Sequence, residues 1–177
     1  DVTGNMLLNT NDTTRKGAEL VVRAAATNGI DEAYGATVDV GGQLTLGNNA
    51  LVSPYCEWKK GAVVNFTVGD LVVDAGAQFN ANGKGYHSGY GRGCPVNDAD
   101  NVGSSYGGRG GSIAKPGSRV ATYGTADNPV FPGSGSGGSA GYTARDWTGG
   151  GAVLVTASRA MTLNGTVSAN GNASEQF

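Results

Sequence analysis

The chain has 177 residues, of which 32 are glycine, and its 14 acidic and 12 basic residues give a net charge of −2. Because only 15% of the residues are charged, the composition excludes a broad nucleic-acid-binding surface. The glycines lack the three-residue period of collagen, and no apolar run approaches the ~20 residues that a membrane-spanning helix needs. Apolar residues make up 38% of the chain and are mainly small or β-branched, which favours a thin core between closely spaced strands.

The first element is expected within residues 1–34, which we interpret as an N-terminal cap or as the first coil of a stack. Glu19–Ala26 is followed by Asn28-Gly29, as a capping helix would be. The same residues could equally form a strand, and the paired valines at 21 and 22 favour that alternative. In either form the segment would cover an open end of the domain.

Residues 35–83 and 151–171 carry a repeated pattern of short apolar segments. Gly35–Asp39 resembles Gly61–Asn65 and Gly151–Val155, and each is followed by two apolar residues at alternating positions and then by a third short segment. The apolar pairs are Leu44/Leu46, Leu71/Val73 and Met161/Leu163, and the third segments are Ala50–Val52, Ala77–Phe79 and Thr166–Val167. Alternation over so few positions indicates half-buried strands that turn sharply at glycine and asparagine.

Three short strands in about two dozen residues are typical of one coil of a parallel β-helix, whose matching positions stack about 4.8 Å apart. No coil can bury its apolar face alone, so the coils must stack. The fold class that we predict is therefore all-β, a right-handed parallel β-helix (β-solenoid) forming a single domain over residues 1–177. An antiparallel β-sandwich or jelly roll is the alternative, because three strand-like copies would fit it too.

Residues 84–150 interrupt the pattern with a glycine-rich insertion that we predict to be ordered. Five of the seven tyrosines fall in it, and disordered linkers are poor in aromatic residues. We expect loops that pack against the coils, where glycines let backbones approach closely. Its arginines could bind backbone carbonyls, or they could form a sugar- or anion-binding face with the aromatic residues. The candidate glycan-binding residues are Tyr86, Tyr90, Arg92, Tyr106, Arg109 and Trp147.

Several runs between residues 61 and 171 carry a resemblance. They are Leu71–Ala77 with Asn82–Tyr86, Ser105–Gly111, Tyr123–Pro129, Pro132–Gly138, Gly149–Ala157 and Leu163–Gly171. They are similar to the glycine-rich right-handed parallel β-helix modules of large extracellular and cell-surface proteins, and the chain resembles the pectin-lyase-like superfamily at the level of fold only. A shared fold does not imply a shared function. On this basis we expect a secreted chain that works outside the cell or at its surface.

Catalytic chemistry has few candidates. If the chain were a polysaccharide lyase or hydrolase acting on acidic glycans, Asp74, Lys84, His87 and Arg92 would carry the reaction, since Lys84 and His87 are close enough in sequence for an acid and base pair. The alternative is that these are polar loop residues. The oxygen-rich run with Asp98 and Asp100 is a weak Ca²⁺ candidate without EF-hand spacing, and we expect no cofactor and no other metal site.

Cysteines and glycosylation sequons complete the candidate sites. Cys56 and Cys94 could form a disulfide or remain two separate thiols. Asparagines at N-x-[ST] sequons are Asn11, Asn65, Asn164 and Asn172, which matter only in a eukaryotic secretory pathway.

The function that we expect first is a structural or adhesive extracellular module, such as a filament subunit or a unit of a surface protein. Residues 172–177 form a short tail that provides little cap, which suits docking to other copies or to neighbouring domains. The acidic-glycan enzyme and a non-catalytic glycan-binding module are the alternatives. Polysaccharide is therefore a further possible partner, whereas nucleic acid and a membrane span are not expected.

Overall fold

The computed structural model describes residues 1–9, 17–25, 34–95, 103–110, 121–125, 127, 129–136 and 147–172, and within these ranges it contains strands and loops but no helix. The strands are β1 (Met6–Leu8), β2 (Glu19–Arg23), β3 (Tyr34–Leu46), β4 (Leu51–Tyr55), β5 (Val63–Val73), β6 (Gln78–Asn80), β7 (Leu154–Ala157), β8 (Met161–Leu163) and β9 (Thr166–Ser168). The all-β prediction is confirmed.

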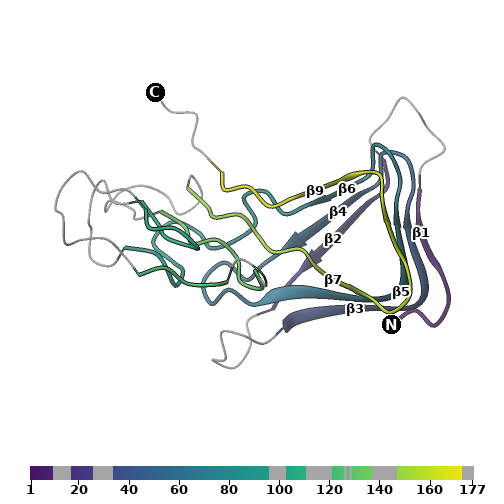
Figure 1. Cartoon of the computed structure of the whole chain (residues 1–177), viewed down its shortest axis with the longest axis horizontal. Helices are drawn as coiled ribbons and strands as arrows, with labels where there is room; N and C mark the ends of the chain where they lie inside the picture. The colour runs from purple at the N-terminus through teal and green to yellow at the C-terminus, as the bar shows by residue number, and fades with distance from the viewer. Residues whose placement is uncertain are drawn as a thin grey trace.

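The strands form two sheets, and the chain alternates between them (Figure 1). One sheet has the order β1-β3-β5-β7, with β8 also paired to β5, and the other has the order β2-β4-β6-β9. Within each sheet, every pair of neighbouring strands is parallel. The antiparallel sandwich alternative is therefore wrong. We call each passage through both sheets a rung, so that the four rungs are β1/β2, β3/β4, β5/β6 and β7/β8/β9.

The core lies between the two sheets because inward positions on successive rungs stack in columns. Leu44 pairs with Leu71, and Val52 pairs with Phe79, and all four side chains are buried. The ring of Phe66 on β5 meets that of Phe79 edge to face, with centroids 5.5 Å apart. Such a contact between the sheets adds to the free energy of burying two large aromatic side chains.

The offset of 27 residues between Leu44 and Leu71, and between Val52 and Phe79, is confirmed by the strand ladders. The match of Gly35–Asp39 with Gly61–Asn65 is wrong by two residues, because Ala36 pairs with Val64. The match of Gly151–Val155 is wrong by one residue, because Leu154 pairs with Asn65. A one-residue shift exchanges the two faces of a strand, so the match of Gly151–Val155 placed inward residues opposite outward ones. Residue composition alone does not show which face of a strand a residue occupies.

The first and second predicted segments of the middle rungs are one continuous strand that bends at a glycine corner. Between Val40 and Gln43 of β3, two glycines face the single Gly69 of β5, which produces a β-bulge. A Cβ on Gly69 would lie 2.6 Å from the carbonyl oxygen of Gly42, so the close approach of the rungs requires glycine there. Figure 1 shows β3 and β5 turning this corner. In the last rung the two segments are separate strands, β7 and β8.

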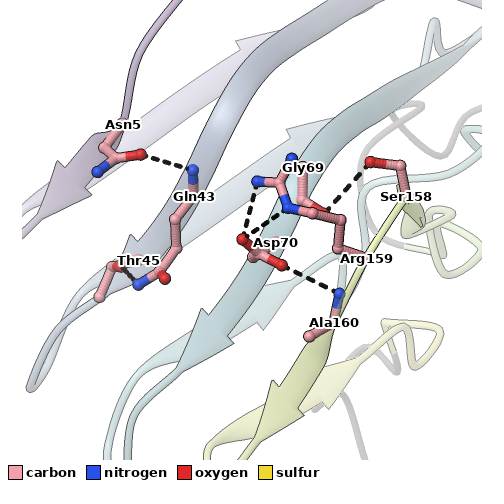
Figure 2. Close-up of polar contacts among 8 residues, drawn as sticks. All are labelled: Asn5, Gln43, Thr45, Gly69, Asp70, Ser158, Arg159 and Ala160. Atoms are coloured by element: carbon pink, nitrogen blue, oxygen red, sulfur yellow. Dashed lines mark hydrogen bonds and ion pairs between the residues drawn. The ribbon is translucent and has the colours of Figure 1, made fainter.

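Side-chain oxygens join neighbouring rungs at the same corner (Figure 2). The carboxylate of Asp70 accepts hydrogen bonds from Arg159 Nε at 3.0 Å, from Arg159 Nη2 at 2.8 Å and from the backbone N–H of Ala160 at 3.1 Å. On an earlier rung, Asn5 Oδ1 accepts the backbone N–H of Gln43 at 2.9 Å. The hydrogen bonds from Arg159 lower the pKa of Asp70. The bridge therefore holds the β7–β8 connection on β5.

The N-terminal segment forms strands in the described residues. Glu19–Arg23 is β2, and each of its residues has a parallel partner on β4. The helix alternative is wrong for this stretch. Leu20 and Val22 face the core, whereas Glu19, Val21 and Arg23 are exposed. The segment therefore serves as part of the first rung.

Glycine backbones of the insertion lie against one another and against the last rung. The Gly85 N–H donates to the Gly149 carbonyl, Gly149 N–H donates to Tyr86, and Gly133 N–H donates to Gly150. Tyr86 is 3% exposed and its hydroxyl donates to the Lys60 carbonyl at 3.2 Å. In this part of the insertion, a tyrosine side chain therefore covers closely spaced glycine backbones.

Candidate functional site

The last rung leaves the interior columns open at one end of the stack. Met161, Leu163 and Val167 pair with Leu71, Val73 and Phe79, which are at most 2% exposed. The three side chains of the last rung are nevertheless 47%, 50% and 50% exposed. No further described strand pairs with β8 or β9, so the open edge combines apolar side chains with backbone groups that can extend the ladder.

The first rung presents the same apolar positions at the opposite end. Met6 and Leu8 pair with Leu44 and Leu46, and Leu20 pairs with Val52. These three side chains are partly buried and pack on the core. The two ends of the stack therefore carry side chains that occupy equivalent columns.

A separate cavity of about 350 Å³ lies where β2 and β4 end. Its described lining residues are Arg23, Tyr55, Cys56, Gly83, Lys84, Gly85, His87, Thr148 and Asn172. Arg23 and Tyr55 are the paired last residues of the two strands, which places the guanidinium 4.0 Å from the centre of the Tyr55 ring. The loop after β6 brings Lys84 Nζ to 5.2 Å from the same ring centre. We call this cavity the cationic pocket.

Burial governs the electrostatics of the cationic pocket. Loss of solvent lowers the pKa of Lys84, and the charge of Glu19 acts in the opposite direction. Lys84 Nζ donates a 3.3 Å hydrogen bond to Asn80 Oδ1, which is a neutral partner. None of the described lining residues is acidic. The pocket thus holds two cations around one phenol ring without a carboxylate in its described wall.

An aromatic group borders the cationic pocket. The rings of Trp58 and His87 are 5.1 Å apart and tilted by 31°, and Tyr90 meets Trp58 edge-on at 5.2 Å. The His87 N–H donates to the Trp58 carbonyl at 3.1 Å, which fixes the loop after β6 on the turn after β4. Trp58 remains 42% exposed. His87 therefore joins the cationic pocket to an indole that is open to solvent.

A larger cavity of about 550 Å³ lies between the insertion and the last rung. Its wall combines glycine backbones at 149–151 with Tyr106, Phe131, Val153 and Val167. The rings of Tyr106 and Tyr123 are 4.6 Å apart, and Tyr123 donates its hydroxyl to the Pro132 carbonyl at 2.8 Å. Burial raises the pKa of both tyrosines. This wall is largely apolar and has no charged residue among its described members.

The structure brings together only part of the predicted enzyme site. Lys84 and His87 line the cationic pocket, whereas Asp74 and Arg92 do not. Asp74 follows β5, where its N–H donates to the Leu46 carbonyl. The Arg92 guanidinium lies 4.4 Å from the centre of the Phe131 ring. The four residues therefore do not form one described site.

The predicted glycan-binding residues are also divided among several places. Tyr86 is buried beneath Gly61, Tyr90 borders Trp58, and Tyr106 lines the larger cavity. Arg109 is exposed, and Trp147 is half-buried with its carbonyl accepting the Ser136 N–H. They share no single face, because the insertion distributes them among separate loops. Asp98 and Asp100, the Ca²⁺ candidates, lie outside the described residues.

The possible disulfide between Cys56 and Cys94 is not formed, and both residues are buried free cysteines. Cys56 packs with Val63 and Ala152, whereas Cys94 Sγ faces the Ser136 carbonyl at 3.9 Å. The two sulfurs therefore have different surroundings. Burial raises the pKa of Cys56 to about 11 and also raises that of Cys94, so neither thiol is activated.

The glycosylation sequons differ in accessibility. Asn65 is half-buried within β5, and its Nδ2 lies 3.4 Å from Thr67 Oγ1. Asn164 and Asn172 are exposed, and Asn172 lines the cationic pocket. Asn11 lies outside the described residues. Asn164 and Asn172 are therefore the described sequon asparagines that are open to solvent.

Sequence reasoning missed Arg23, Tyr55 and Trp58. Arg23 and Tyr55 are 32 positions apart and become neighbours only through the parallel register of β2 and β4. That register follows from the inward alternation of Leu20 with Val52, which was a usable signal. Trp58 lies in a short polar turn between two strands, where an exposed tryptophan is unusual enough to mark a surface.

Among the described residues, no three His, Cys, Asp or Glu side chains gather in a way that would hold a metal ion. The same part of the chain contains no helix that is long and apolar enough to cross a membrane. The resemblance to glycine-rich β-helix modules stays a prediction. In comparisons with known proteins, no family model, no curated protein and no solved structure matches this chain.

Proposed function

We propose that the chain is a structural extracellular module, built as a right-handed parallel β-helix, whose copies join end to end. The observation that carries this proposal is the open last rung, where Met161, Leu163 and Val167 continue buried columns yet are about half exposed. Covering such side chains is favourable by roughly 25 cal/mol per Å² of apolar surface.

The occupant that suits this edge is the first rung of a second copy. Both ends carry the same columns, so β8 and β9 of one copy would face β1 and β2 of the next in the parallel orientation of every other pair. Head-to-tail contacts form an open filament unless the rotation between copies closes a ring, and stacking along the axis of the rungs favours the filament. The right-handed sense is supported by the rule that parallel crossover connections are right-handed in about 98% of cases.

Assembly can be tested with two substitutions on adjacent residues of β8. Leu163→Lys places a charge in the interior column of the open edge, whereas Thr162→Lys places it on the opposite face of the same strand. We expect the wild type and Thr162→Lys to sediment as concentration-dependent oligomers, with filaments visible by electron microscopy. Leu163→Lys should need at least about tenfold higher concentration to assemble, since burying an unpaired charge is costly.

A wild-type chain that stays monomeric at all accessible concentrations would overturn the assembly proposal. Equal assembly of the Leu163→Lys and Thr162→Lys variants would also overturn it. The extracellular part of the proposal rests on the resemblance carried by residues 61–171, and it is tested by fractionating source cells. Recovery of the chain in the cytosolic fraction alone would contradict it.

A further inference from the structure

We propose that the cationic pocket binds a carboxylated sugar, with the carboxylate held by Arg23 and Lys84 and an adjoining sugar ring on Trp58. This inference is independent of end-to-end assembly, because its residues lie at the ends of β2 and β4 and on the loop after β6 rather than on the open last rung.

Charge is the first reason. The Arg23 guanidinium and the Lys84 ammonium lie 4.0 Å and 5.2 Å from the same Tyr55 ring centre, so at most about 9 Å separates them. Both cations line the same cavity, so an anionic group inside it is attracted by both charges. The hydrogen-bond partner of Lys84 Nζ is the neutral Asn80 amide, and no described residue of the pocket wall is acidic. A bound carboxylate would accept short charge-assisted hydrogen bonds from such cations.

The neighbouring aromatic group is the second reason. His87 lines the pocket and packs against Trp58, so the cationic wall continues directly onto an indole that is 42% exposed. A sugar ring presents hydroxyls on its edge and C–H groups on its face, and the face suits an exposed indole. Lys59 Nζ lies 5.6 Å from the centre of the Tyr90 ring and is not among the described lining residues of the pocket.

Pocket size and shape are the third reason. A volume of about 350 Å³ is near the lower limit of roughly 300–1,000 Å³ for small-ligand sites, so it suits one or two sugar units. Arginine and lysine side chains bind phosphate as well as carboxylate, so the cations alone do not select between the two anions. A carboxylate on a sugar ring is the ligand class that uses the cations of the pocket and the exposed indole together.

Calorimetric titration tests the proposal with a matched pair of ligands. One is a tetrasaccharide containing glucuronic acid, and the other is the same tetrasaccharide with its carboxyl groups reduced to alcohols. Inorganic phosphate is titrated separately. The protein variants are Lys84→Met, which keeps the apolar stem but removes the charge, Trp58→Ala, and Lys59→Met as a control cation outside the pocket.

We expect the acidic tetrasaccharide to bind the wild type at least about tenfold more tightly than its reduced form, since one charge-assisted hydrogen bond corresponds to about that factor. Lys84→Met should reduce this preference because only Arg23 then remains, and Lys59→Met should keep it. Trp58→Ala should weaken both sugars by a similar factor. Far-ultraviolet circular dichroism confirms that each variant is folded.

Any of four results would overturn the proposal. The first is no binding of the acidic tetrasaccharide by the wild type. The second is equal affinity of the wild type for the acidic and the reduced sugar, and another is an unchanged affinity for the acidic sugar in Lys84→Met. The last is binding of inorganic phosphate without binding of sugar, which would make the pocket a simple anion site.

Discussion

Val52 and Val167 occupy the same interior column. Replacing each by alanine compares how much a side chain contributes to the free energy of unfolding in a covered rung and in the open last rung. Val52 lies in the second rung and is fully buried, whereas Val167 lies in the last rung and is 50% exposed. Phe79 lies between them in the column and pairs with both. The comparison therefore removes the same atoms from the middle and from the end of one stack.

The expected magnitudes follow from burial. Truncating valine to alanine removes two carbon groups, each worth roughly 0.8 kcal/mol when buried. At Val52 the unfilled cavity adds to this, so the free energy of unfolding should fall by about 2.5 kcal/mol. At Val167 half of the side chain is already in water and solvent can fill the space, so the loss should be about 0.8 kcal/mol.

Urea unfolding monitored by circular dichroism provides the measurement, at low micromolar protein so that monomers dominate. Equal slopes with urea in the two variants and the wild type would show that the change lies in stability and not in the surface exposed on unfolding. Raising the protein concentration should increase the apparent stability of the wild type more than that of Val167→Ala, because assembly covers the open rung.

Equal losses in the two variants would refute the account of the open end. In that case Val167 would be as well packed as Val52, and the exposed apolar edge would not exist in solution. A larger loss at Val167 than at Val52 would refute it more strongly, since packing would then be tightest in the last rung.

Two further predictions concern titratable groups. Hydrogen bonds from Arg159 lower the pKa of Asp70 below its ordinary value of 3.8, so the bridge adds stability above that pH and loses it as the pH falls through the lowered value. The difference in stability between the wild type and Asp70→Asn should shrink as the pH is lowered from about 5 to about 2, and a constant difference would contradict the bridge. Burial raises the pKa of Cys56 to about 11 and also raises that of Cys94, so at pH 8 a thiol reagent should label both slowly in the folded protein and rapidly after unfolding without reductant. Failure to label either cysteine after unfolding would instead reveal a disulfide.

Much of the fold could be predicted because the alternation of apolar residues reports directly on burial. The columns through Leu44, Leu71 and Met161, and through Val52, Phe79 and Val167, are visible in the sequence as repeated positions. The alternation of apolar residues, with glycine and asparagine at the turns, predicted that the strands stack in parallel. The strand ladders are parallel throughout the described residues. The mismatch at Gly35–Asp39 keeps each residue on its own face, because it amounts to two residues, and it arose because glycine and alanine were matched by type without the bulges that set the register.

The candidate binding site was only partly predictable. Lys84 and His87 were identified, but Asp74 and Arg92 were grouped with them by residue type alone. Nothing local to Arg23 indicates that Tyr55 lies beside it, because their contact depends on the register between β2 and β4. The free cysteines show the same limit, since the sequence contains two thiols but not the separate surroundings of their side chains.

The sequence by itself determined that this chain forms short strands with one apolar face and that those strands must stack, because no single rung can bury its own side chains. Only the tertiary structure decided where the stack bends, at Gly69, and which residues meet at its surface. Inward residues repeat because each contacts its equivalent on the next rung. Surface residues such as Arg23, Lys84 and Trp58 come together through loops and register, which leave no periodic signal in the chain.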